Sequence, residues 1–249
     1  MIDRCEEYFN GADRVAVTKV DVTSAAQALA RGHLCGPVSA YFLSRACAAA
    51  ALLGAEAGDP EETVILQMKC DGPLGGFNVE CTAAGTLRGY TERKTLEAFD
   101  GLGKPDPAAV IGGYQIQVVR SIPGRILSRG VSNSLDGYLA GSLQRKAVIF
   151  TEAEVTDDVK VVFARGTMIE VMPDSAASIA DYGETVDLSG FELRRSRPLS
   201  FACRCSPERA VAMLSALSEN DKSGLPDAID ITCHMCGRTF TVRNPADNA

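Results

Sequence analysis

Four cysteines near the C-terminus are the residues of this chain whose types and spacing could do chemistry. Cys203 and Cys205 stand in the run CRCS, and Cys233 and Cys236 stand in the run CHMCG. Thiolates are soft ligands, and two short pairs supply the four that a closed tetrahedral zinc site needs. Each pair can also close into a disulfide. The sequence therefore predicts a site that binds Zn²⁺ when reduced and loses its ligands on oxidation.

The residues after the second pair favour a metal knuckle over a redox dithiol of the thioredoxin type. In thioredoxin-like proteins the pair begins a helix, whose dipole lowers the pKa of the first thiol. Here Gly237 follows Cys236, and residues 239–242 alternate as in a strand. A thiol-disulfide oxidoreductase and idle structural thiols are the alternatives to metal binding.

The segment that carries these cysteines is too small to fold securely on its own core. Modules of about 45 residues usually depend on a metal or on disulfides. Structural zinc contributes about 10–16 kcal/mol of apparent binding free energy in small finger peptides. Arg204, Arg209 and Arg238 lie close in sequence and could offset the negative charge of four thiolates, or could be ordinary solvated arginines. We expect this module to unfold when its metal is removed.

The other residues with reactive side chains are weaker candidates. His33 fits a helix end or a core position better than a catalytic one, and His234 fits an exposed spacer inside the knuckle. The remaining cysteines fall in apolar patterns and are predicted to be inert small hydrophobes: Cys5, Cys35, Cys47, Cys70 and Cys81. The chain has no GxSxG run and no phosphate-loop lysine, so we expect a protein that is not an enzyme.

Composition sets the broad class. With 249 residues, 46% of them hydrophobic and 23% charged, the chain should form one main globular domain and one minor one. A net charge of −7 argues against nucleic-acid binding. The longest apolar run, residues 46–55, falls short of the roughly 20 residues that cross a bilayer, so no membrane span is expected. Nine cysteines without an apolar signal core point to the reducing cytoplasm.

Periodicity predicts an α+β fold with a mixed sheet domain, a short linker and a small zinc-binding module. The domain boundaries follow as residues 1–173, 174–198 and 199–249. Apolar residues every three or four positions predict a largely buried helix over 37–57, and a helix is expected over 134–146. Alternation predicts a hairpin of strands 64–70 and 77–83, and further strands at 114–118, 147–155 and 159–172. In the module, Ser206 and Pro207 should begin a short helix, and strand, turn and strand should surround the last cysteine pair.

Several runs together give the chain a family resemblance. With CRCSPER followed by CHMCG, and with DGPLGGF leading through ECTAAGTLRGY, it resembles the heat shock protein 33 family of redox-regulated holdase chaperones. The likeness continues more loosely in GHLCGPVSAYFLSRACAAAALL and FARGTMIEVMPD. The two cysteine pairs are fairly specific in combination with the N-terminal runs.

The resemblance implies an ATP-independent chaperone that is inactive while Cys203, Cys205, Cys233 and Cys236 hold one Zn²⁺. Oxidation would then form the Cys203–Cys205 and Cys233–Cys236 disulfides, release zinc and unfold the linker. The exposed apolar surface would bind unfolding client proteins, and the oxidised chain could form a homodimer. Two departures bear on this: the stretch between Pro173 and Cys203 is shorter than the family's linker, and SNSLDGYLAGSLQRK lacks the acidic, glutamine-containing pattern expected there. A constitutive zinc-ribbon protein-binding module is the alternative.

Overall fold

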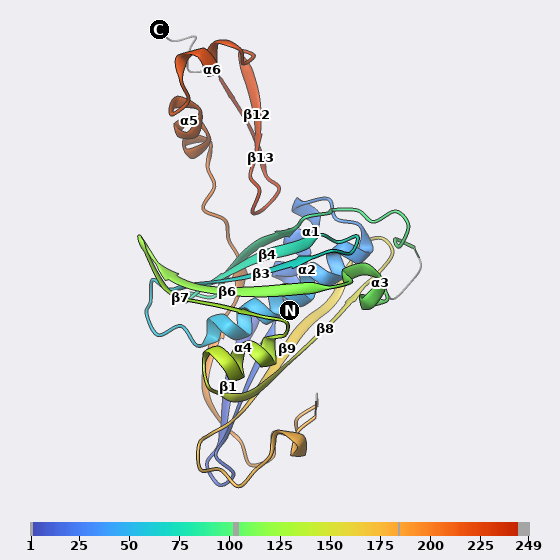
Figure 1. Cartoon of the computed structure of the whole chain (residues 1–249), viewed down its shortest axis with the longest axis vertical. Helices are drawn as coiled ribbons and strands as arrows, with labels where there is room; N and C mark the ends of the chain where they lie inside the picture. Colours follow the sequence, from blue (N-terminus) through green and yellow to red (C-terminus); the bar gives the residue numbers. More distant parts are fainter. Residues whose placement is uncertain (1, 102–104, 184, 244–249) are drawn as a thin grey trace.

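The computed structural model describes residues 2–101, 105–183 and 185–243, which form two large sheets and a separate small hairpin (Figure 1). Sheet A has the strand order β10 (Glu192–Pro198), β1 (Arg4–Asn10), β2 (Val15–Asp21), β9 (Val161–Val171) and β8 (Lys146–Val155). Sheet B has the order β11 (Ser200–Phe201), β5 (Thr86–Thr91), β4 (Gly76–Thr82), β3 (Thr63–Cys70), β6 (Tyr114–Ile122) and β7 (Arg125–Ser132). The predicted hairpin is β3 and β4, whose antiparallel register pairs Leu66 with Val79. These sheets and the helices around them confirm the α+β fold class.

Helix α2 (Pro37–Ala55) lies between the two sheets and packs against strands of both. All of its residues except Pro37 and Arg45 are buried, because the helix is apolar on every side rather than amphipathic. Its many alanines let the strands approach closely. By length and composition α2 could cross a membrane, but 94% of its most apolar 18-residue window is buried inside the protein, as in a core helix.

The other helices of the described residues are short. They are α1 (Thr23–Gly32), α3 (Pro107–Ile111), α4 (Leu135–Ser142), the 3₁₀ turn η1 (Ile179–Asp181), α5 (Pro207–Ser215) and α6 (Glu219–Ser223). Helix α4 ends before the predicted residue 146. Gln144 adopts a positive φ of 54°, which breaks the helix, and Lys146 already begins β8.

Sheet A is apolar on both faces. On one face Val20, Ala164 and Met168 join the core around α2. On the other face, Val15, Val17, Ile169 and Val171 form a second apolar cluster. The chain after β9 closes over this second face with these residues: Ala177, Ile179, Tyr182, Val186, Leu188 and Phe191. Part of the stretch predicted to be a linker therefore serves as the cover of an apolar sheet face.

The rest of the predicted linker contains a strand. Residues 192–198 form β10, which pairs antiparallel with β1 at the edge of sheet A. The chain then crosses to sheet B, where β11 pairs parallel with β5. This continuous segment ties the edges of both sheets together immediately before Cys203.

The C-terminal module projects from the main body, with its knuckle end turned toward β4 and α1 (Figure 1). Its hairpin consists of β12 (Ala228–Thr232) and β13 (Thr239–Arg243), as the strand, turn and strand pattern predicts. A small core of Ala210, Leu214 and Val242, with four partly buried neighbours, joins the hairpin to α5. Residues 244–249 of the predicted module lie outside the described residues.

Candidate metal and redox centre

A tight turn positions the second cysteine pair. Between β12 and β13, the amide of Cys233 donates to the carbonyl of Arg238 at 2.8 Å, and the amide of Gly237 donates back to Cys233 O at 2.8 Å. Gly237 has a φ of 73°, a left-handed conformation that glycine adopts without steric cost. The turn therefore holds Cys233 and Cys236 on the same side of one loop.

The first pair lies between a strand and a helix. Cys203 follows β11 closely, and Cys205 precedes Ser206, the N-cap of α5. The Ser206 side chain accepts a hydrogen bond from the amide of Arg209, and Pro207 occupies the first turn, as predicted. Two ordered elements thus fix the short loop that carries Cys203 and Cys205.

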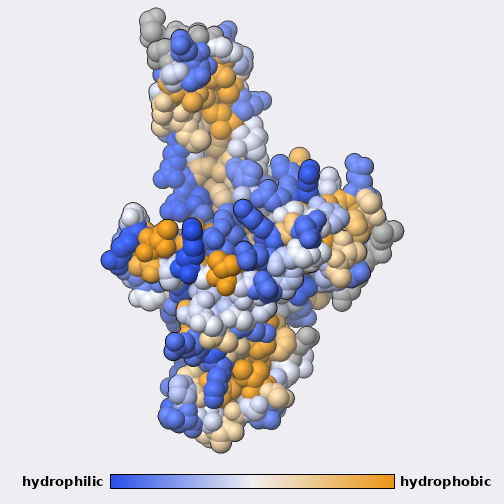
Figure 2. All heavy atoms as spheres, in the orientation of Figure 1, coloured by the Kyte–Doolittle hydropathy of each residue, from blue (hydrophilic) through white to orange (hydrophobic). Residues whose placement is uncertain are grey.

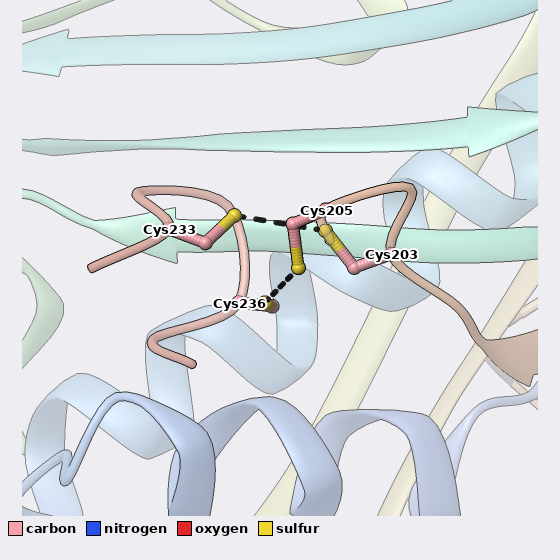
Figure 3. A group of neighbouring side chains, drawn as sticks. All are labelled: Cys203, Cys205, Cys233 and Cys236. Carbon is pink, nitrogen blue, oxygen red and sulfur yellow. Dashed lines mark hydrogen bonds between the residues drawn. The ribbon is translucent and has the colours of Figure 1, made fainter. Parts of the chain in front are cut away.

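The four thiols converge from these two loops (Figure 3). All four Sγ atoms lie within 4.8 Å of one another. The Sγ atoms of Cys203 and Cys233 are 3.7 Å apart, and those of Cys205 and Cys236 are 3.4 Å apart. A tetrahedron with Zn–S bonds near 2.3 Å has sulfur–sulfur edges of about 3.8 Å. The thiols can therefore share one metal ion with little movement.

Electrostatics favour a thiolate at Cys203. Partial burial works against its charged form, but hydrogen bonds from the backbone of Cys205, from the neighbouring thiols and from the Arg88 guanidinium outweigh burial and lower the pKa of Cys203 to about 7. Burial, together with hydrogen bonds to the other thiols, raises the pKa of Cys205. In the metal-free reduced state, Cys203 is consequently the first of this pair to ionise.

Arg88 is the residue of this centre that the sequence reasoning missed. It lies on β5, its guanidinium pairs with Glu80 of β4 at 2.6 Å, and it helps to lower the pKa of the Cys203 thiol. Of the three arginines singled out from the sequence, Arg204 reaches toward the same carboxylate at 3.7 Å, and Arg209 and Arg238 are exposed. Polar residues at alternate positions of β4 and β5, among them Asn78, Glu80 and Arg88, could have signalled a polar sheet face, but only the fold shows what covers it.

The two histidines lie where the sequence predicts, and both take part in contacts next to the centre. His33 follows the end of α1, is 2% exposed, and its Nε2 donates to Gly89 O at 2.9 Å. His234 is exposed, and its ring packs edge-on against Tyr90 with 3.9 Å between centroids. Neither histidine belongs to the group of side chains that could share the metal ion.

The five remaining cysteines are free thiols in or beside the main core. Burial raises the pKa of Cys35 to about 11 and that of Cys81 to about 12. Burial also raises the pKa values of Cys5, Cys47 and Cys70. Because thiolates are the reactive form, these five are poor targets for oxidants, in agreement with their predicted role as small hydrophobes.

Fold and thiol cluster together define an α+β protein whose small C-terminal module can hold a metal ion. The model of the family described as Hsp33 protein matches residues 3–243. The chain therefore belongs to the Hsp33 family.

Curated relatives and a solved structure agree with this assignment. A "33 kDa chaperonin" of Symbiobacterium thermophilum is 28% identical over 84% of each chain. Another of Thermus thermophilus is 24% identical over 92% of this chain and 81% of the relative. The crystal structure of the 33 kDa chaperonin, a heat shock protein 33 homolog, from Thermotoga maritima has the same fold, with a TM-score of 0.81 and 19% identity over 98% of this chain and 96% of that one. The family and these names support a chaperone.

Proposed function

We propose that this chain is a redox-regulated, ATP-independent holdase that binds unfolding proteins after a zinc-bound four-cysteine switch is oxidised. The observation that carries the proposal is the convergence of Cys203, Cys205, Cys233 and Cys236, all within 4.8 Å, in a module with a very small core. Such a module folds securely only with its metal, so loss of the ligands unfolds it. Because the chain belongs to a chaperone family, we expect its partners to be unfolding client proteins.

Zinc is the metal that this donor set fits best. Four thiolates in tetrahedral arrangement are typical of structural zinc sites, and we expect one Zn²⁺ per chain in the reduced state. Bound zinc would keep the four thiols deprotonated and hold the two loops together. All nine cysteines are free, which suits the cytoplasm, where thiols stay reduced.

Oxidation would remove the ligands in two steps. In each step, two cysteines lose two electrons to one molecule of hydrogen peroxide and form a disulfide. The peroxide takes up these electrons and two protons and becomes two molecules of water. Following the family resemblance, we assign the disulfides to Cys203–Cys205 and Cys233–Cys236. Distances alone do not select this pairing, because the Sγ atoms of Cys203 and Cys233 and those of Cys205 and Cys236 are also close, at 3.7 and 3.4 Å. Peptide mapping of the peroxide-treated chain tests the assignment.

The apolar face of sheet A supplies a surface for client proteins. It is covered by the chain segment that leads directly, through β10 and β11, to Cys203. When the module unfolds, this segment loses its C-terminal anchor, and the face of Val15, Val17 and Ile169 becomes available. We propose that unfolding proteins bind there, and that the exposed face also allows two oxidised chains to associate.

The deciding experiment follows zinc and client protection together. Purified reduced protein should hold about one zinc, release it to peroxide as measured with a colorimetric chelator, and only then suppress light scattering by a heated client. Cys233→Ser should bind zinc weakly and lose the dependence on peroxide. Retention of zinc under strong oxidant would contradict the proposal.

The same assays separate the two alternatives. A constitutive zinc-ribbon binding module would protect clients equally in the reduced and oxidised states. A thiol oxidoreductase would reduce insulin with turnover, but here Cys236 is only 3% exposed and the pair opens no helix. The absence of insulin reduction would dismiss that reading and would agree with a protein that is not an enzyme.

A further inference from the structure

The outer edge of strand β5 is covered in turn by three separate parts of the chain. The amides of Ser200 and Ala202 donate to Gly85 O and Leu87 O at 3.0 and 3.1 Å. Further along, the amide of Gly89 donates to Met235 O at 3.0 Å. The carbonyl of Gly89 accepts from His33, at the end of α1. Edge groups that would otherwise face solvent or another chain are thus paired.

Two of these covering segments carry the two cysteine pairs. Cys203 follows Ala202 directly, so the first pair is held by the β11 end of the edge. Met235 lies between Cys233 and Cys236, so the second pair is held by Gly89. Leu87 and Gly89, two residues apart on β5, bind the segments that carry the two pairs and therefore set the distance between them.

The approach of the knuckle to the main body depends on two facing glycines. A Cβ on Gly32 would lie 2.4 Å from Cys236 O, and a Cβ on Gly237 would lie 1.9 Å from Gly32 O. Both distances are far below a normal contact. The two backbones can touch only because neither residue has a side chain.

Side chains from β4 and β5 complete the contact. The Tyr90 ring meets His234 edge-on, and the Arg88 guanidinium is held by Glu80 on the same face of β4 and β5. Four thiolates around a divalent ion carry a net charge of about −2, which a cation of the main body partly offsets. The main body therefore contributes hydrogen bonds, packing and charge around the thiol cluster.

We propose that the β5 edge is the template on which the two thiol pairs are brought together, so that the main domain raises the metal affinity of the C-terminal module. This inference rests on metal binding by the four cysteines but not on client binding. Linkage makes the effect reciprocal: bound metal holds the knuckle on the edge, and loss of metal leaves the Gly89 amide without its partner.

Gly32→Ala in the full-length chain tests the template without changing a thiol. The added methyl group pushes the knuckle away from β5. Groups that orient metal ligands from outside typically change affinity about 10- to 100-fold, so zinc affinity measured by chelator competition should fall by that order. Hydrogen exchange in peptides that contain Gly89 should be faster in metal-loaded Gly32→Ala than in metal-loaded wild type. Removal of zinc from wild type should produce the same increase.

Gly141→Ala is the matched control, because this glycine also lies in a helix and a Cβ there meets nothing within 4 Å. It should keep wild-type affinity and exchange. Wild-type affinity and exchange in Gly32→Ala would overturn the template.

A second variant decides the question if Gly32→Ala does not fold. His234 is exposed, so His234→Ala leaves the main core intact while removing the contact with Tyr90. Faster exchange at Gly89 in its zinc-loaded form supports the template, and unchanged exchange overturns it. Zinc binding by wild type is measured first, so failure of the proposed metal switch is recognised separately.

Discussion

At the scale of single residues, the charge around Cys203 sets which thiol responds first. Arg88 belongs to a strand of the main domain, whereas Cys203 belongs to the module, so a residue distant in sequence helps to lower the pKa of the Cys203 thiol. A nearby cation stabilises the thiolate, which is the form that attacks peroxide. The reactivity of Cys203 therefore depends on a residue outside the cysteine motifs.

A pH titration of metal-free reduced protein tests this dependence. Because the pKa of Cys203 is lowered from 9.0 to about 7, its thiolate persists above pH 7 and is lost as the pH falls through that value. Alkylation of Cys203 by iodoacetamide, followed by mass spectrometry, should therefore reach half its plateau rate near pH 7. Arg88→Met should move the midpoint upward. Arg204→Met, in an exposed neighbour of Glu80, should leave it in place. A wild-type midpoint near 9 would contradict the assignment.

At the scale of elements, burial of α2 on all sides should make it the least tolerant helix of the main domain. Leu52 is fully buried between the sheets. Leu52→Ala removes its packing and leaves a cavity, which should lower the free energy of unfolding by about 2–5 kcal/mol. Urea unfolding followed by circular dichroism measures the loss. Val162→Ala, at a 43% exposed position of β9, should cost less than about 1 kcal/mol, and equal losses in the two variants would contradict the burial of α2.

The sequence predicted the elements that carry a hydrophobic pattern and missed those held by backbone pairing. Helix α2, hairpin β3–β4 and the strands around Cys233 and Cys236 all show their periods in the chain. Strand β10 pairs with β1 along its whole length, but its side chains are almost all exposed. Backbone hydrogen bonds leave no alternation of apolar residues, so the segment looked like an irregular linker.

The sequence predicted that the four cysteines would come together, and the structure brings them together. Cysteine spacing points to this group because the pattern is local to the two pairs. The contacts of the module with the main domain could not be predicted from the sequence. Gly32 comes close to Gly237, and Arg88 close to Cys203, only when remote segments fold together.

At the scale of the whole molecule, one chain segment links the apolar face of sheet A to the C-terminal module. It covers that face with residues from 177–183 and 185–191, runs along β1 as β10, joins β5 as β11 and ends at Cys203. Apolar side chains also gather on the module and on the lower part of the molecule (Figure 2). The length of this segment is shorter than the family resemblance led us to expect, yet it reaches both sheets and the thiols.

Weakening the cover should therefore activate the protein without oxidation. Val186 is 9% exposed and packs on the second face of sheet A. Val186→Asp would place a carboxylate against the apolar side chains of this cluster, which costs free energy and favours release of the segment from the sheet. Reduced, zinc-loaded Val186→Asp should then bind more of a hydrophobic fluorescent dye and should suppress aggregation of a heated client before peroxide is added.

Leu193→Asp is the matched control, because the same change is made in the same segment at a residue that is 53% exposed. It should stay inactive until oxidised and should retain the dye binding of the wild type. If the two variants behaved alike, client proteins would not bind to this face of sheet A. If zinc content stays at one per chain in Val186→Asp while protection appears, the surface that binds clients and the centre that senses oxidant are distinct, and the segment from 177 to 202 is the connection between them.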